Sequence, residues 1–137
     1  MVEVKGSDRV SIDRNVHDYY IQLSRQSRSG PEDAPFLLMK DVFMWSVALG
    51  VERGKRRVVS GSREQIFRWD QFSQETDIPA LKAIALAETG DVEVLVDEAR
   101  ILRIAEEFAN EGIWELKTRL LDRQGKALWN LVDEVRG

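Results

Sequence analysis

Residues 39–57 read MKDVFMWSVALGVERGKRR, and this stretch decides the fold. Apart from Lys40 and Asp41, its residues as far as Val51 are apolar or small on almost every side of a helix. Such a helix lies in the middle of a domain, or divides its apolar faces between its own core and a partner. Proline suits the first turn of a helix and glycine its left-handed end. The predicted core helix therefore begins near Pro35 and stops at Gly54.

The chain before this helix shows weaker patterns. Residues 9–13 (RVSID) alternate between polar and apolar, which is typical of a half-exposed strand. Asp13 can cap a helix over residues 14–26, whose apolar side chains recur at spacings of three and four. Residues 27–35 (SRSGPEDAP) have the composition of a loop.

The chain after the core helix begins with an irregular segment. Residues 55–71 have weak periodicity and are predicted to be extended, with a turn at residues 60–62. Asn110-Glu111-Gly112 and Gly125 are expected to interrupt the helices that follow, and residues 92–96 (VEVLV) fit either a short strand or a helical turn. The predicted helices span residues 80–89, 97–110, 113–123 and 127–135.

These elements predict a mainly α protein, a single compact helical domain over residues 1–137 with one or two short β-strands. The N-terminal strand-helix and loop occupy residues 1–35. The core helices occupy residues 36–123 and include a basic segment at residues 53–69. Residues 124–137 form a C-terminal helix.

The composition excludes several kinds of site. The chain has no cysteine, which rules out disulfides and thiolate metal sites, and its single histidine rules out a multi-histidine metal site. Residues 1–10 (MVEVKGSDRV) lack the apolar core of a signal peptide. The apolar stretch at residues 36–51 is too short to span a bilayer. We therefore expect a cytoplasmic protein without a membrane partner.

The charge is unevenly distributed along the chain. The net charge is −4, yet residues 1–69 contain 12 Lys/Arg and nine Asp/Glu, whereas residues 70–137 contain eight and 15. Such asymmetry indicates one face for a polyanion and another for a protein partner. An uneven surface without a partner explains the same numbers.

The basic segment is the candidate nucleic-acid-binding site. Cations bind phosphates through the release of counterions, and exposed aromatic side chains stack on unpaired bases. The cations that follow Gly54 also complement the dipole of the core helix, and we favour burial of Phe67, Trp69 and Phe72 in the core. The predicted binding residues are Arg53, Lys55, Arg56, Arg57, Arg63 and Arg68.

Groups with catalytic chemistry are few. His17 is the only conventional general base, and it stands near the start of an amphipathic helix, where a surface role is typical. The glycines at positions 50, 54 and 61 do not form a phosphate-binding loop. We predict no catalytic residue, no cofactor and no metal site.

Two alternative functions remain open. Arg9, Ser11 and Asp13 share one face of the predicted strand, which two helices follow, as in a dimeric ribbon-helix-helix regulator. Asp91 and Glu93 belong to an acidic cluster that a magnesium-dependent nuclease would use, although Asp91 also serves as a helix cap.

Three segments resemble a known family: FLLMKDVFMWSVALGVERGKRR, FRWDQFS and LKAIALAETGDVEVLVDEARILRIAEEFANEGI. They are similar to the family of Dnd-system-associated protein four, encoded beside bacterial DNA phosphorothioation genes. The resemblance covers residues 36–113, about three-fifths of the chain. It implies an accessory role in antiphage defence, in which DNA lacking backbone sulfur is restricted, and it transfers no catalytic residue.

Together these observations predict a non-enzymatic accessory protein of a phosphorothioation-dependent restriction system. It would bind DNA through the basic segment, or a protein subunit of the modification or restriction system through its acidic half. A homo-oligomer is compatible with the sequence.

Overall fold

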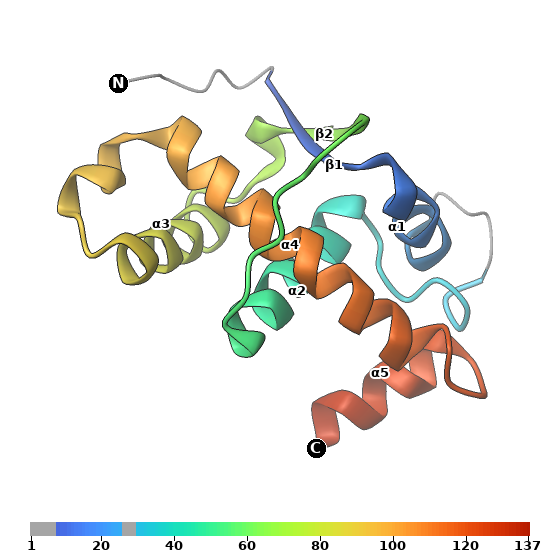
Figure 1. Ribbon diagram of the computed structural model, residues 1–137. Coiled ribbons are helices and arrows are strands. Elements are labelled where there is room, and N and C mark those ends of the chain that lie inside the picture. The colour runs from blue at the N-terminus through green and yellow to red at the C-terminus, as the bar shows by residue number, and fades with distance from the viewer. Residues whose placement is uncertain (1–7, 26–29) are drawn as a thin grey trace.

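The computed structural model describes residues 8–25 and 30–137 (Figure 1). Within these ranges it is mainly α-helical with one two-stranded antiparallel sheet, which confirms the predicted fold class. The elements are β1 (Arg9–Asp13), α1 (His17–Leu23), α2 (Met39–Arg53), β2 (Arg63–Arg68), α3 (Asp77–Thr89), α4 (Glu98–Leu120) and α5 (Ala127–Arg136).

The crossing of α2 and α4 forms the centre of the molecule (Figure 1). A Cβ atom on Gly112 of α4 would overlap the carbonyl oxygen of Ser46 on α2, and one on Gly50 would overlap that of Phe108. Glycine therefore lets the two backbones touch. The predicted break at residues 110–112 is wrong for this reason, because Gly112 serves helix packing inside one continuous 23-residue helix.

The core helix α2 begins later than predicted. Pro35 precedes an extended residue, Phe36, whose N–H donates to the carbonyl of Leu23 at 3.1 Å. The Asp41 carboxylate then accepts the N–H of Leu38 at 3.1 Å and starts the helix at Met39. The predicted stop is confirmed, because Gly54 adopts a left-handed conformation with φ 68°.

The helix after β1 is shorter than predicted. Asp13 accepts the N–H of Asn15 at 2.9 Å and opens a 3-10 turn, after which α1 ends at Leu23. The backbone beyond α1 bonds to Phe36 instead, since the N–H of Arg25 donates to its carbonyl at 3.0 Å. Gln26 and residues 27–29 of the predicted loop lie outside the described residues.

The predicted extended segment supplies the second strand. β2 pairs with β1, and Val10 faces Phe67 across the pair. Phe67, Trp69 and Phe72 are 2–5% exposed and pack edge to face, which confirms that these aromatic side chains anchor the segment to the core.

The second half follows the predicted helices apart from the missing break. α3 ends at Gly90, which has a positive φ, and residues 92–96 form a 3-10 turn rather than a strand. Gly125, with φ 98°, lies in the turn before α5. In the described part of the chain, no helix has the length and apolar character needed to cross a bilayer.

Candidate nucleic-acid interface

The segment between α2 and β2, residues 55–62, crosses α4 and is called the strap here (green in Figure 1). Its backbone is bonded to α4. The N–H of Arg57 donates to the carbonyl of Glu107 at 3.0 Å. The side-chain amide of Asn110 donates to the carbonyls of Arg57 and Val58 at 3.2 and 3.3 Å. The strap is therefore a fixed part of the fold.

The basic side chains around the strap face a row of glutamates on α4, which we call the acidic row: Glu107, Glu111 and Glu115. Arg53 lies 3.3 Å from Glu111 and 3.2 Å from Glu115. Arg57 lies 3.4 Å from Glu111. The four-residue spacing of the acidic row places its carboxylates on one helix face, within reach of the arginines.

Arg56 and Arg57 also lie over aromatic rings of α4. The guanidinium carbon of Arg56 is 5.9 Å from the centre of the Phe108 ring, and that of Arg57 is 5.8 Å from the Trp114 ring. Arg56 in addition bridges Glu88 of α3 at 3.1 Å and Glu107 at 3.4 Å. Ion pairs and cation–π contacts together hold these side chains in place.

The remaining predicted residues are spread along the strap and β2. Arg63 pairs with Glu106 at 3.1 Å, and Arg68 pairs with Asp70 at 3.2 Å. Lys55 is exposed and has no ion pair with any residue that the structure describes. The structure thus brings Arg53, Arg56 and Arg57 together over α4, whereas Arg68 lies at the far end of the sheet.

Glu106 is a buried carboxylate between α4 and the sheet. It is 7% exposed, and it accepts the N–H of Ser11 at 2.8 Å and a guanidinium N–H of Arg63 at 3.1 Å. Burial raises the pKa of Glu106, and the bonds from Ser11 and Arg63 oppose that rise. Burial also raises the pKa of Tyr20, which lies near Ser46 and Glu106.

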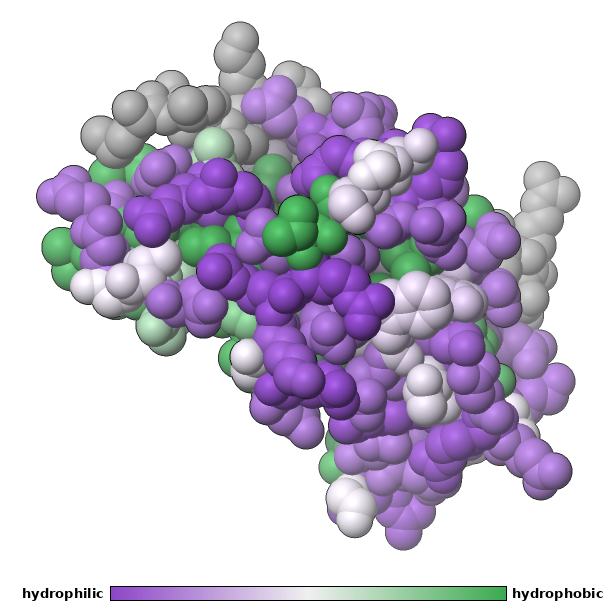
Figure 2. Space-filling view, viewed as in Figure 1, coloured by the Kyte–Doolittle hydropathy of each residue, from purple (hydrophilic) through white to green (hydrophobic). Residues whose placement is uncertain are grey.

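The ion pairs explain the uneven charge of the sequence. Basic residues of the first half lie on acidic residues of the second, so much of the asymmetry is neutralised inside the fold. The guanidinium groups are not enclosed, because the side chains of Arg53, Arg57, Arg63 and Arg68 remain 41–53% exposed. The face that carries the strap is predominantly hydrophilic (Figure 2).

The nucleic-acid-binding residues predicted from the sequence do not include Arg9. Arg9 stands directly opposite Arg68 in the sheet. The alternation in β1 placed Arg9 on the exposed face, but only the pairing of β1 with β2 reveals its arginine neighbour. That pairing lies within one chain, and the N–H of Ser11 is occupied by Glu106, so the strand that a ribbon-helix-helix dimer would share is already bonded.

The acidic cluster near the start of α4 has capping roles. Asp91 accepts the N–H of Glu93 at 3.0 Å and lies 3.6 Å from Arg100. Asp97 accepts the N–H of Arg100 at 3.2 Å. Among the described residues, no three acidic or histidine side chains gather in a way that could hold a metal ion. His17 lies 3.5 Å from Glu64 at the surface.

Comparison with curated proteins gives no match, and comparison with solved structures gives none either. A family model described as DNA sulphur modification system-associated protein 4 matches residues 9–134, from the first residue of β1 into the last helix. That match includes β1 and most of α5, which lie outside the three segments whose sequence resembles the family. The chain therefore belongs to the family of DNA sulphur modification system-associated protein 4.

Proposed function

We propose that this protein is a non-enzymatic, cytoplasmic accessory of a bacterial DNA phosphorothioation-dependent defence system, and that it binds DNA. Membership of the family supports the link to a DNA sulphur modification system. The contacts to phosphate come from the surface formed by Arg53, Lys55, Arg56, Arg57, Arg63 and Arg68.

The observation that carries this proposal is that the paired arginines keep donors for a ligand. A guanidinium has five N–H donors, and each ion pair occupies only part of them. Arg63 approaches Glu106 through Nη2, and Arg57 approaches Glu111 through Nη2. The other N–H groups of these half-exposed side chains can donate to a phosphate oxygen.

The glutamates then act as supports that orient the arginines. Glu107 and Glu111 are 17% and 13% exposed, so they lie beneath the guanidinium groups rather than beside them in solvent. A side chain that is already held in place loses less conformational entropy when it binds. The same carboxylates lower the local positive potential, which predicts modest affinity, and the phosphates that the cations neutralise make that affinity depend on salt.

Lys55 provides the test with the fewest structural side effects, because it has no ion pair within the described residues. We expect Lys55→Ala to weaken binding of a short duplex and to reduce the slope of log K against log salt by about 0.9. Arg136→Ala is the control, because it removes one exposed cation that belongs to α5 rather than to the strap or β2. Equal affinity of Lys55→Ala and wild type would remove Lys55 from the interface.

A protein subunit of the same system is a second candidate partner, and one observation favours it. On α5, Trp129 is 55% exposed and Val135 is 67% exposed, with Val132 half-buried between them at three-residue intervals. Exposed tryptophan is enriched at protein interfaces. Co-purification with the neighbouring gene products, lost on Trp129→Ala, would identify this contact, and retention in the variant would exclude it.

A further inference from the structure

The outer face of the β1–β2 ribbon carries two arginines that belong to different strands and lie at the same end of the pair. Arg9 and Arg68 are directly opposite each other, and like charges in cross-strand pairs are destabilising. Arg68 is compensated by Asp70, whereas Arg9 is exposed and has no ion pair with a residue in the described ranges. A ligand of opposite charge would offset this cost.

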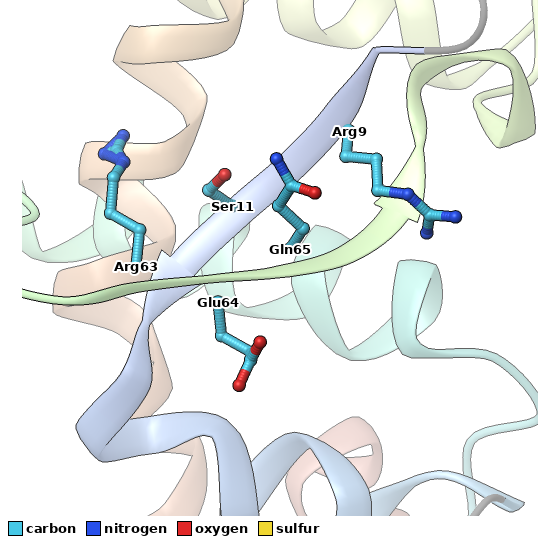
Figure 3. A pocket seen from close by; sticks show the side chains of 5 residues that line it. All are labelled: Arg9, Ser11, Arg63, Glu64 and Gln65. Carbon is cyan, nitrogen blue, oxygen red and sulfur yellow. The ribbon is translucent and has the colours of Figure 1, made fainter.

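A hollow of about 480 Å³ lies on this face, lined by Arg9, Ser11, Arg63, Glu64 and Gln65 (Figure 3). Arg63 and Arg9 stand at opposite ends of the hollow, and Ser11 and Gln65 lie between them. The two arginines are exposed, as is Gln65. This arrangement places cationic donors at both ends and a neutral hydroxyl and amide in the middle.

The acidic side chains of the ribbon have other partners. Glu64 points to the opposite side from Ser11 and Gln65 (Figure 3), and its carboxylate lies 3.5 Å from His17 and 3.9 Å from Arg14. Asp13 accepts the N–H of Asn15 at 2.9 Å. Asp13 stands opposite Arg63 in the strand pair, so an anion near Gln65 meets cationic side chains at both ends of the hollow and one carboxylate beside Arg63.

We infer that the outer face of the ribbon enters the major groove of duplex DNA, with Arg9, Arg63 and Arg68 on backbone phosphates and Ser11 and Gln65 toward base edges. This inference rests on the proposed DNA binding and names the element that enters the groove. The major groove admits a two-stranded β-ribbon. Serine and glutamine are suited to base edges, and arginine to phosphate.

Three variants test the ribbon. For each variant, binding is measured to a duplex and to a single strand of the same sequence, and inorganic phosphate is added as a competitor. Arg9→Ala should weaken duplex binding several-fold and lower the salt slope by about 0.9, while Arg9→Lys should restore most of the slope. Gln65→Ala should weaken duplex binding with an unchanged slope, because a neutral side chain releases no counterion. Wild type should prefer the duplex to the single strand.

The stability of Arg9→Ala separates a lost contact with DNA from a loss of folding. Removing one of two opposed arginines leaves the unfolding midpoint equal or higher, so weaker binding by Arg9→Ala cannot come from loss of folding. If Arg9→Ala and Gln65→Ala bind the duplex as tightly as wild type does, the ribbon is not the element that contacts DNA, and the proposed function still stands. If wild type binds the single strand as tightly as the duplex, or if inorganic phosphate at a similar concentration displaces the duplex, the ribbon does not enter the major groove. Failure of wild type to bind any duplex would overturn both proposals.

Discussion

Arg57 of the strap and Glu111 of α4 form an ion pair at 3.4 Å, and the backbone N–H of Arg57 donates to the backbone carbonyl of Glu107 at 3.0 Å. A residue predicted to bind nucleic acid thus also ties the strap to the central helix. The carboxylate and a bound phosphate would share the donors of one guanidinium, so the effect of Glu111 on folding and on binding can be measured separately.

Glu111→Gln should tighten DNA binding and lower stability. The change removes the charge of the carboxylate that Arg53 and Arg57 share, so the local positive potential that attracts phosphate rises, at a cost of about 1 kcal/mol in the free energy of unfolding. Urea denaturation and fluorescence anisotropy with a duplex measure the two effects. Glu134→Gln is the matched control, because Glu134 also pairs with two arginines, Arg119 and Arg123, and has no ion pair with Arg53 or Arg57.

If Glu111→Gln and Glu134→Gln alter DNA affinity equally, the gain comes from net charge alone and the strap arginines are not the contact. A fall in affinity confined to Glu111→Gln would show that the carboxylate positions the arginines more than it restrains them.

Gly112→Ala should destabilise the protein by at least about 2 kcal/mol, because the added methyl group overlaps the backbone of Ser46 rather than a movable side chain. Gly30→Ala is the control, since nothing lies near its Cβ position and its backbone needs no positive φ. Thermal unfolding of both variants checks the close crossing of α2 and α4. Equal melting temperatures would contradict it.

The stability of the protein relative to Glu106→Gln should rise as the pH falls. The folded-state pKa of Glu106 is raised by burial, so folding disfavours its charged form. Its favourable contribution is complete below the ordinary pKa of glutamate, about 4.3, and is lost as the pH rises through the folded-state value. Urea midpoints of the two proteins across this range provide the measurement, and parallel pH curves would show that Glu106 does not titrate differently in the folded state.

Asn110→Ala should expose the strap to trypsin. Its side-chain amide holds two strap carbonyls, and Lys55, Arg56 and Arg57 are cleavage sites that the bonded backbone protects. Asn130→Ala removes a comparable buried amide, bonded to the carbonyl of Leu120, without touching the strap. Cleavage between residues 55 and 58 at the same rate in both variants would show that Asn110 does not fix the strap.

The elements that local patterns govern could be predicted from the sequence. The alternation of residues 9–13 and the apolar run ending at Gly54 indicated β1 and α2 correctly, because burial and left-handed glycine geometry act on neighbouring residues. The prediction of a helix break at Gly112 was wrong, because the group that requires a glycine there is the backbone of Ser46 in α2, 66 positions away. Local patterns carry no sign of such a contact.

The candidate site could be predicted only in part, because local patterns in the sequence show its charges but not its long-range contacts. The run from Arg53 to Arg68 is visible as charge, and Phe67 and Trp69 were correctly assigned to the core. The pairing of Arg53 and Arg57 with the acidic row depends on the path of the strap over α4. The row itself has a helical spacing in the sequence, but nothing in the sequence places the strap on it.

The salt dependence of duplex binding by the wild-type protein tests the central claim most directly. If the surface of the strap and ribbon contacts backbone phosphates, log K should fall linearly with log salt, by about 0.9 for each phosphate that a cation neutralises. No detectable binding at low salt, or an affinity that does not change with salt, would contradict the account.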